Sequence, residues 1–213
     1  MIEVIHALRA DSPVAQELYH FRYRVFVQHA GWKLACHQQL ERDQFDTERA
    51  VHLVSRAANG RIAGLLRLLP STSPYMIECL WADLLGPYPA PRSPHIWEVT
   101  RLGTDPDLGL RERGQTVAEL VAACLEYGLD HGIREMLAVM SEDHARRVVE
   151  GMGWGYERCG PVRLLEDGSP VIALRLRLSE DALASVRRRT RLPHRLCPEA
   201  PITRAQPAPA LPA

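Results

Sequence analysis

The sequence predicts an α/β (α+β) protein, a sandwich in which a mixed central sheet is flanked by helices. Segments with strand or helix periodicity follow one another in an order that starts with a strand and ends with a hairpin. Two dipeptides typical of hairpin turns, Asn59-Gly60 and Asp167-Gly168, separate pairs of apolar runs. The composition, 46% hydrophobic and 24% charged in 213 residues, is that of an ordinary globular protein.

The first predicted elements are a strand and a helix. Alternation of apolar side chains predicts a strand over residues 2–8. Ser12 is placed to cap a helix, and Pro13 suits its first turn. We expect this helix to run to about residue 26, because apolar side chains recur at helical spacing at Val14, Leu18, Phe21 and Val25. Residues 31–46 are polar and irregular, which predicts a loop or a short helix.

A hairpin and an irregular stretch form the middle of the chain. Strands are predicted over residues 51–55 and 62–69, joined by the Asn59-Gly60 turn and ended by a proline. Residues 70–94 are rich in proline and serine, and a short helix is expected around residues 76–85.

The second half of the chain alternates strands and helices. Residues 96–102 carry bulky and β-branched side chains, which predicts a central strand. Residues 115–131 form the clearest predicted helix, because their apolar side chains share one face. The remaining elements are a strand over 136–140, a helix over 142–152 capped by Ser141, and strands over 158–165 and 171–178 around Asp167-Gly168. This order fits a mixed sheet.

Composition changes near residue 186. We expect a single folded domain over residues 1–186 and a disordered tail over residues 187–213 that is rich in arginine, proline and alanine. The tail has six arginines against one glutamate, although the whole chain balances 26 basic against 26 acidic side chains. The predicted domain is therefore acidic, and an anionic partner would dock on a local basic patch or on the tail.

Composition also excludes several classes of protein. A formal net charge of +0 argues against a protein that coats nucleic acid or a membrane surface, so neither is an expected partner. The apolar runs are short and the first residues lack a signal pattern, so we expect neither a membrane span nor a secretory signal. Five widely spaced cysteines favour reduced thiols in the cytoplasm. The histidines show no metal-ligand spacing, so no metal site is expected.

Glu98 and Arg101 are charged residues within an apolar strand. Three residues apart, their side chains point to opposite faces unless a β-bulge interrupts the alternation, so one of them should face the interior or a cleft. A buried carboxylate has a raised pKa and can act as a general base near neutral pH. The alternative is a structural ion pair, which one sequence alone favours.

A second group combines aromatic and charged side chains. Arg22 and Phe26 lie one helical turn apart, and Trp32 follows in the next loop. Asp43 and Asp46 bracket a further aromatic residue. Aromatic faces beside carboxylates suit a cationic, purine-bearing small molecule. The alternative, favoured by spacing alone, is a packing contact between the aromatic rings with both aspartates in solvent.

Arg67 lies in an otherwise apolar strand and needs a partner, because an unpaired buried charge is strongly destabilising. That partner could be Asp43, Asp46 or Glu98, or the carboxylate of a substrate held in a bidentate fork. Of these, structural pairing within the protein is the simpler interpretation.

Taken together, these residues resemble the acyl-homoserine lactone synthases, the LuxI-type autoinducer synthases of Gram-negative bacteria. Order and spacing match over most of residues 2–155. The segments that carry the resemblance are 21–27, 31–32, 41–46, 64–70, 71–77 and 96–101. Each segment is weak evidence alone, and their occurrence in order makes the resemblance specific.

The resemblance implies a fold like that of the acetyltransferase (GNAT) superfamily, a three-layer sandwich. It also implies a reaction in which an acyl thioester acylates the α-amine of S-adenosylmethionine. The carboxylate of the same molecule then attacks its γ-carbon and expels methylthioadenosine, leaving an acyl-homoserine lactone, a quorum-sensing signal. S-adenosylmethionine is a substrate of this reaction, so no cofactor is expected.

The resemblance also implies roles for individual residues. Glu98 is the expected general base, with Arg101 as the second catalytic residue. The expected S-adenosylmethionine site consists of Arg22, Phe26, Trp32, Asp43, Asp46 and Arg67. The expected acyl and thioester pocket is bordered by Trp81, Thr100 and Ser141, and Trp81 stands where the family usually has phenylalanine.

The expected acyl donor is a thioester of acyl carrier protein or of CoA. Residues 111–116 partly match the phosphate-binding loop of acetyltransferases, in which a glycine frees N–H groups at a helix start. Two alternatives to the synthase remain: an acetyl-CoA-dependent GNAT N-acetyltransferase of unknown substrate, and an inert regulator that binds acyl thioesters. The first has no need of Trp32 or of residues 43–46, and the second would be favoured if Glu98 were absent.

Overall fold

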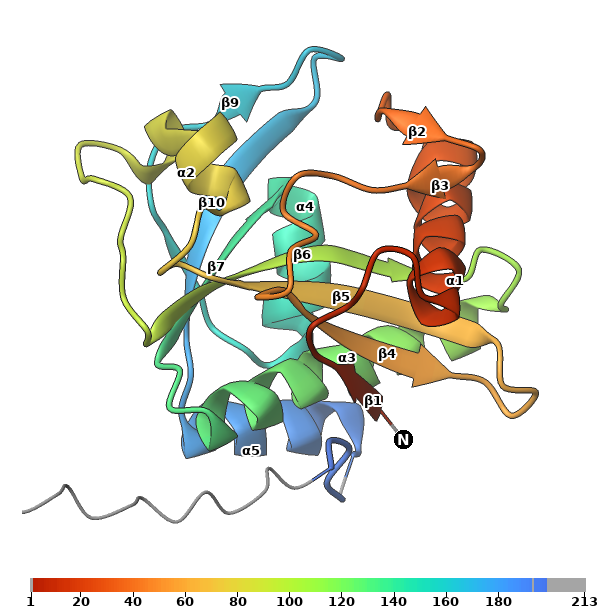
Figure 1. Cartoon of the computed structure of the whole chain (residues 1–213). Helices are drawn as coiled ribbons and strands as arrows, with labels where there is room; N and C mark the ends of the chain where they lie inside the picture. The colour runs from red at the N-terminus through yellow and green to blue at the C-terminus, as the bar shows by residue number, and fades with distance from the viewer. Residues whose placement is uncertain (1, 193, 199–213) are drawn as a thin grey trace, which may run out of the picture.

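The computed structural model describes residues 2–192 and 194–198 (Figure 1). The strands are β1 (Ile2–Ile5), β2 (Cys36–His37), β3 (Leu40–Glu41), β4 (Val51–Arg56), β5 (Ile62–Pro70), β6 (Ile96–Thr104), β7 (Glu135–Met140), β8 (Glu157–Arg158), β9 (Arg163–Leu164) and β10 (Pro170–Arg177). The α-helices are α1 (Pro13–Arg22), α2 (Met76–Leu80), α3 (Leu110–Asp130), α4 (Glu142–His144) and α5 (Glu180–Thr190). Wide π-helical turns form η1 (Tyr23–His29) and η3 (Ala145–Val149), and 3-10 turns form η2 (Ala82–Leu85) and η4 (Glu150–Met152).

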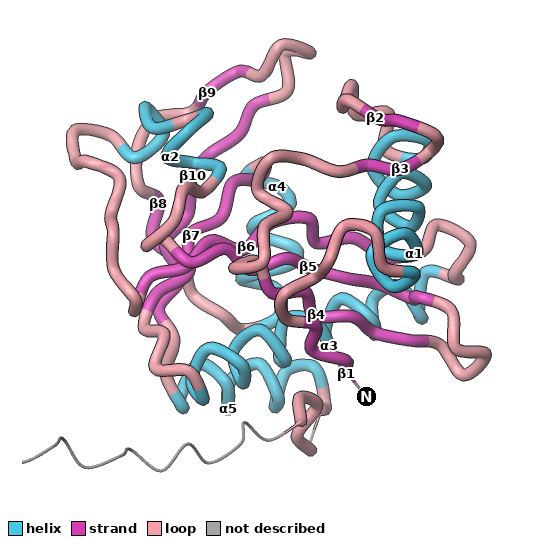
Figure 2. Tube along the Cα trace, viewed as in Figure 1, coloured by secondary structure: helices cyan, strands magenta, loops and turns pink. Residues whose placement is uncertain are grey.

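One twisted sheet organises the chain. Its strand order is β1-β4-β5-β6-β7-β10-β8, and β9 pairs with β10. Neighbouring strands are antiparallel except β6 and β7, which run parallel. Helices α3 and α5 cover one face of this sheet, while α1 and α2 lie over the other (Figures 1 and 2). The predicted three-layer sandwich with a mixed central sheet is confirmed.

The two faces follow from alternation along the strands. On β5, Leu65 packs with the buried side chains of α1, whereas its neighbour Leu66 packs with those of α3. Because successive side chains of a strand point to opposite faces, an apolar strand of this kind holds a helix on each side. The strand is buried along its whole length and forms a rigid support for polar groups placed at its end.

Helix α1 begins as predicted, and the helical segment that it forms with η1 ends later than predicted. The Ser12 hydroxyl accepts a hydrogen bond from the amide of Ala15 at 3.2 Å, and Pro13 occupies the first helical position. The helix passes without interruption into η1, which ends at His29 instead of near residue 26. A π-helical turn holds one extra residue and is common at functional sites.

Further elements differ from the sequence prediction. The hairpin of β2 and β3 lies within the predicted loop of residues 31–46, and strands of two residues are too short to show alternation. Helix α3 starts at Leu110 rather than at residue 115. The strand predicted over residues 158–165 is divided into β8 and β9, which pair with different parts of β10.

Packing of the chain continues beyond residue 186, so the predicted domain boundary lies inside α5. Val186 is fully buried on α3 within the main apolar cluster, and Cys197 belongs to the same cluster. The Glu126 carboxylate accepts hydrogen bonds from the amides of Leu196 and Cys197 at 2.9 and 2.8 Å. Charge composition concealed this packing, because arginines dominate the exposed face of α5. The disorder predicted for residues 199–213 lies outside the described residues.

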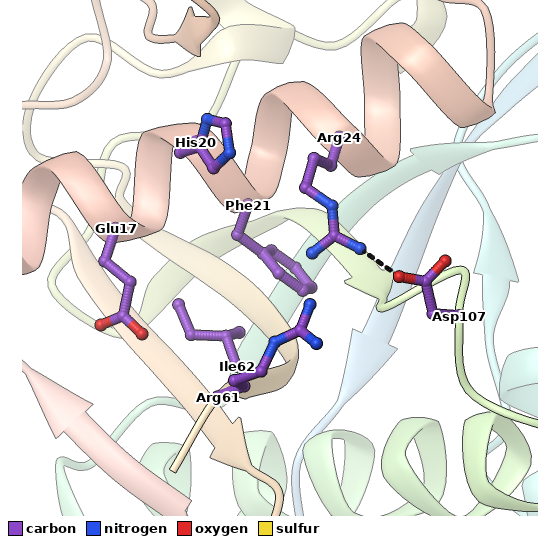
Figure 3. A pocket seen from close by; sticks show the side chains of 7 residues that line it. All are labelled: Glu17, His20, Phe21, Arg24, Arg61, Ile62 and Asp107. Atoms are coloured by element: carbon purple, nitrogen blue, oxygen red, sulfur yellow. Dashed lines mark hydrogen bonds and ion pairs between the residues drawn. The ribbon is translucent and has the colours of Figure 1, made fainter. Parts of the chain in front are cut away.

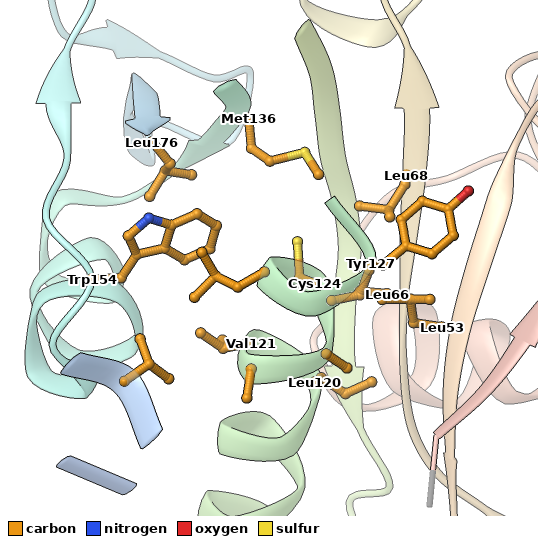
Figure 4. Packing of buried hydrophobic residues seen from close by; sticks show 14 of the residues in the cluster. Leu53, Leu66, Leu68, Leu120, Val121, Cys124, Tyr127, Met136, Trp154 and Leu176 are labelled. Carbon is orange, nitrogen blue, oxygen red and sulfur yellow. The ribbon is translucent and has the colours of Figure 1, made fainter. Parts of the chain in front are cut away.

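The main core lies between α3 and the sheet (Figure 4). Leu120, Val121 and Cys124 of α3 are buried beside residues from β4, β5, β7 and β10. Burying one such aliphatic side chain contributes about 1.5–3 kcal/mol. No helix in the described part of the chain is both long and apolar enough to cross a membrane.

Candidate active site

A β-bulge in β6 brings Glu98 and Arg101 to the same side of the sheet. Arg67 pairs with Thr100 and Leu65 pairs with Gly103, so two residues of β6 lie opposite one residue of β5. Arg101 lies in this interval with a φ of 55°. The extra residue interrupts the alternation of side chains along β6. Glu98 and Arg101 therefore do not point to opposite faces, which is the exception that the sequence allowed for a β-bulge.

Glu98 and Arg101 both contact the first residue of α2. Glu98 Oε2 accepts a hydrogen bond from the Met76 amide at 2.7 Å, and Oε1 accepts one from the Ile77 amide at 3.2 Å. Arg101 Nη1 lies 3.7 Å from Met76 Sδ. Glu98 has no ion-pair partner among the described residues, so the alternative of a structural ion pair for Glu98 is not what is observed.

The environment of Glu98 is suited to a general base. Its side chain is only 1% exposed. Burial raises the pKa of Glu98 to about 7, even though the two amide hydrogen bonds favour its ionised form. A carboxyl group with that pKa exchanges protons readily near neutral pH.

Three arginines and three carboxylates form a neutral cluster beside Glu98, which we call the arginine cluster. Its members are Arg22, Arg67, Arg101, Glu41, Asp43 and Asp46. Arg22 donates from Nε to Glu41 at 2.5 Å and from Nη1 to Asp46 at 2.6 Å. Arg101 Nη2 donates to Glu41 at 3.0 Å and to Asp43 at 2.7 Å. Five predicted residues from four separate segments, namely α1, the loop of residues 41–46, β5 and β6, therefore meet here.

Arg67 takes the structural partners that its position demanded. Its Nη1 donates to Asp43 and Asp46 at 2.7 and 2.6 Å, and its Nη2 donates to Asp43 at 2.9 Å. Its Nε donates to Thr100 Oγ1 at 3.0 Å. Thr100 is thus a contact of the arginine cluster in addition to lying on β6. The alternative in which both aspartates lie in solvent is wrong, since Asp46 is buried and Asp43 is only 20% exposed at its side chain.

Glu41 and His52 were not singled out from the sequence. Glu41 lies two residues before Asp43, and this spacing in an extended segment places both carboxylates on one side. Burial opposes ionisation of Glu41, but hydrogen bonds from Arg22 and Arg101 outweigh it and hold the pKa of Glu41 below its usual value. His52 is fully buried 3.7 Å from Asp46, and burial lowers its pKa, which favours the neutral imidazole.

Phe26 and Trp32 form an aromatic wall next to the arginine cluster. Their rings stack with centroids 4.9 Å apart and planes at 23°. Phe26 is buried, whereas Trp32 remains 45% exposed. The guanidinium carbon of Arg101 lies 5.9 Å from the Phe26 ring centroid. The predicted aromatic contact is therefore present, and its exposed half is free to stack with a ligand.

The other predicted residues lie around the divergence of β6 and β7. These strands share paired positions only from Ile96–Glu135 to Glu98–Leu137, and then each continues with its other neighbour. Thr100 follows this point on β6. Ser141 follows the end of β7 and caps α4 by accepting a hydrogen bond from the His144 amide at 3.2 Å. Trp81 is half-buried against the apolar cluster under α2.

The glycine-containing segment 111–116 is helical instead of forming a loop. Gly109 caps α3, and its amide donates to the Glu112 side chain at 3.2 Å. The Glu112 side chain thus lies at the start of α3, where the sequence predicted that a phosphate would bind. Among the described residues, no three His, Cys, Asp or Glu side chains are grouped so that they could hold a metal ion.

Two surface cavities lie away from these residues. One of about 430 Å³ lies between α1, η1, the β4–β5 turn and the loop before α3 (Figure 3). It is lined by Glu17, His20, Phe21, Arg24, Arg61, Ile62 and Asp107. The other, of about 440 Å³, lies at the end of α5 and is lined by Arg187, Arg188, Arg191 and Leu192. No residue predicted for catalysis or substrate binding lines either cavity.

Comparison with known proteins agrees with the geometry. The family model described as autoinducer synthase matches residues 6–186. An acyl-homoserine-lactone synthase of Ralstonia nicotianae is 34% identical over 171 residues, which cover 78% of this chain and 82% of the relative. The crystal structure of TofI, in a ternary complex with an inhibitor and MTA, has a TM-score of 0.75 at 32% identity and covers 87% of this chain and 95% of TofI.

Other solved structures share the fold at lower identity. BjaI, a CoA-dependent acyl-homoserine lactone synthase solved with SAM and isopentyl-CoA, has a TM-score of 0.81 at 26% identity, covering 91% of this chain and 90% of BjaI. A Lactobacillus plantarum protein assigned to the N-acetyltransferases has a TM-score of 0.56 at 20% identity, which supports the GNAT-like fold alone. The family match favours the lactone synthase over both alternatives. This chain belongs to the autoinducer synthase family, the acyltransferases that make acyl-homoserine lactones.

Proposed function

We propose that this chain joins an acyl group to S-adenosylmethionine and closes the lactone, with Glu98 as the general base. One observation carries the proposal. Glu98 is a buried carboxylate with a pKa raised to about 7 and no ion-pair partner among the described residues, beside a cluster of paired charges. An ammonium group cannot attack a thioester until it loses a proton, and Glu98 is the group suited to accept it.

The chemistry takes place in two steps. The α-ammonium of S-adenosylmethionine gives a proton to Glu98, and the free amine attacks the thioester carbonyl carbon. The carbon–sulfur bond of the thioester breaks, and a second amine proton passes to the leaving thiolate. In the next step, a carboxylate oxygen attacks the γ-carbon, and the bond from that carbon to the sulfonium sulfur breaks. Methylthioadenosine leaves, and this step transfers no proton.

We place the S-adenosylmethionine site between the aromatic wall and the outer edge of the arginine cluster. The half-exposed Trp32 would stack on the adenine, since bases stack on aromatic faces. Asp43 is the most exposed carboxylate of the cluster and bonds both Arg67 and Arg101. Its carboxylate would face the cationic part of the substrate, while Arg22 and Asp46 hold the cluster together from within. This role for S-adenosylmethionine is that of a substrate, and the mechanism uses no cofactor.

We place the acyl thioester where β6 and β7 diverge. Past the Glu98–Leu137 pair, the strands no longer bond to each other, which would give the thioester carbonyl access to backbone groups near Glu98. Thr100 and Ser141 would flank the thioester, and Trp81 would contact the acyl chain. The relative BjaI was solved with isopentyl-CoA, which supports a CoA donor. An acyl carrier protein donor stays open for this chain, and the assay below distinguishes the two.

We also propose a cytoplasmic location. All five cysteines are free, and Cys36 and Cys79 are exposed. Exposed free thiols persist in a reducing compartment.

The direct test is an assay of the purified protein. It would be incubated with S-adenosylmethionine and panels of acyl-CoA and acyl carrier protein thioesters, and the products would be identified by mass spectrometry. We expect an acyl-homoserine lactone and methylthioadenosine in equal amounts from at least one donor. Absence of lactone with every donor in both panels would contradict the proposal.

A further inference from the structure

Arg24 lines the first cavity. It lies on the same helical segment as Arg22 and Phe26 but faces away from them. Arg24 Nη2 donates to Asp105 Oδ1 at 2.9 Å and to Asp107 Oδ2 at 2.7 Å. Figure 3 shows the guanidinium reaching from η1 across to the loop that holds Asp107. The mechanism proposed above makes no use of this pair.

Asp105 is the fixed point of this contact. Its side chain is only 7% exposed, and its Oδ1 also accepts the Asp107 amide at 3.1 Å. Its own amide donates to the Ala63 carbonyl at 2.8 Å, which ties the residue to β5. An ion pair with one nearly buried partner held by the backbone is more strongly constrained than a flexible surface pair.

The same junction is closed by packing at Gly103. A Cβ atom at Gly103 would lie 2.8 Å from Val25 Cγ1 and 2.9 Å from Phe26 Cζ, closer than real Cβ atoms approach. The end of β6 therefore lies directly against η1. The apolar contact sets how close the two segments come, and the pair of Arg24 with Asp105 resists sliding of one past the other.

The two segments carry opposite sides of the proposed site. Strand β6 holds Glu98 and Arg101, and the α1–η1 segment holds Arg22 and Phe26. We propose that Arg24 and Asp105 are a positioning pair, which holds η1 against β6 so that the S-adenosylmethionine site is formed before the substrate arrives. This inference rests on the location proposed above for S-adenosylmethionine. Preformed geometry lowers the ordering cost of binding, so its loss weakens substrate affinity more than it slows the chemical step.

The chain offers a matched control in Arg56. Its guanidinium donates to both carboxylate oxygens of Glu17 at 2.8 and 2.9 Å and thereby ties α1 to β4. This ion pair anchors the same helical segment to the sheet but makes no contact with β6. Arg56→Gln removes an anchor of α1 and leaves the junction with β6 unchanged.

The test measures S-adenosylmethionine binding by titration calorimetry and steady-state kinetics for Arg24→Gln, Arg24→Lys, Asp105→Asn and Arg56→Gln. We expect Arg24→Gln and Asp105→Asn to weaken binding about tenfold and to raise KM for S-adenosylmethionine equally, with kcat changed less than about twofold. Arg24→Lys should recover part of the loss, and Arg56→Gln should bind like the unmodified protein. Asp107→Asn, at an exposed residue, provides a milder variant with a smaller effect in the same direction should Asp105→Asn fail to fold.

The outcomes separate this inference from the proposed function. Folded Arg24→Gln protein with unchanged affinity would overturn the positioning role while leaving the reaction intact. Equal losses in Arg24→Gln and Arg56→Gln would also overturn it, because a general loosening of the helix would then explain both. If the unmodified protein bound no S-adenosylmethionine, the proposed function would fail and the inference with it.

Discussion

The Glu98 carboxylate lies 2.7 Å from the amide nitrogen of Met76, so the first turn of α2 orients the proposed base. No described cation lies within ion-pair distance of Glu98, although three arginines form the cluster beside it. Those arginines form their ion pairs with Glu41, Asp43 and Asp46 instead. Burial raises the pKa of Glu98, and because the arginines pair within the cluster, the attraction of Arg67 does not cancel this rise.

Glu98→Gln should abolish most of the activity and leave the fold intact. The amide has nearly the same shape, and its oxygen can still accept a hydrogen bond from α2, but it cannot take a proton from the substrate. We expect the rate of methylthioadenosine release to fall by about 10²–10⁴-fold, the range typical of a lost general base. Release of methylthioadenosine can be followed by liquid chromatography.

Glu126→Gln is the matched control for this substitution. Glu126 is equally buried and also accepts two amide hydrogen bonds, but it lies in the C-terminal contact between α3 and residues 196–197. The Glu126→Gln protein should be less stable than the unmodified protein but should release methylthioadenosine at the same rate. If Glu126→Gln lost as much turnover as Glu98→Gln, the effect at Glu98 would be structural.

Arg22→Ala should mainly lower the free energy of unfolding. Arg22 is fully buried, and its removal leaves Glu41 and Asp46 with one fewer cation each in the interior. Breaking a buried pair by removing one partner costs about 3–5 kcal/mol. Urea unfolding should show this loss, whereas Arg188→Ala on the exposed face of α5 should change stability by less than about 0.5 kcal/mol. Equal stabilities of the two variants would contradict the cluster's structural role.

Trp32→Ala should weaken S-adenosylmethionine binding without unfolding the protein. The ring lies at the surface and is 45% exposed, so its loss leaves the core intact, and an aromatic stacking contact contributes about 0.5–1.5 kcal/mol. We therefore expect KM for S-adenosylmethionine to rise by about three- to tenfold and Trp32→Phe to retain most of the affinity. A Trp32→Ala protein with an unchanged KM would place the adenine elsewhere.

Much of the fold followed from local pattern, because the strands and helices of the domain have clear periodicity. The failures are instructive. The β2–β3 hairpin is too short for alternation to show, and the arginines of α5 concealed its contact with α3 through Leu183 and Val186. Helix α5 has its apolar side chains on one face only, and the charge of the remainder dominated its composition.

The residues of the site could be predicted from the sequence, but their arrangement in space could not. Glu98, Arg101 and Arg67 could be named because charges in apolar strands require partners, and the aspartates because they lie beside aromatic residues. Their common side depends on the bulge at Arg101, and a bulge leaves no signature in one sequence when no glycine marks it. Glu41 was not predicted because it lies in the polar segment before Asp43, where one more acidic residue is not unusual.

The most direct measurement of the role of Glu98 is the pH dependence of kcat/KM for methylthioadenosine release. A base acts only when deprotonated, and burial raises the pKa of Glu98 to about 7, so activity should fall as pH drops through about 7. Titration of the substrate amine affects every variant alike and can be subtracted by comparison with Glu98→Gln. We predict an acid limb near pH 7 in the unmodified protein that is missing from the residual activity of Glu98→Gln. The same limb in both proteins would contradict the assignment of Glu98 as the base.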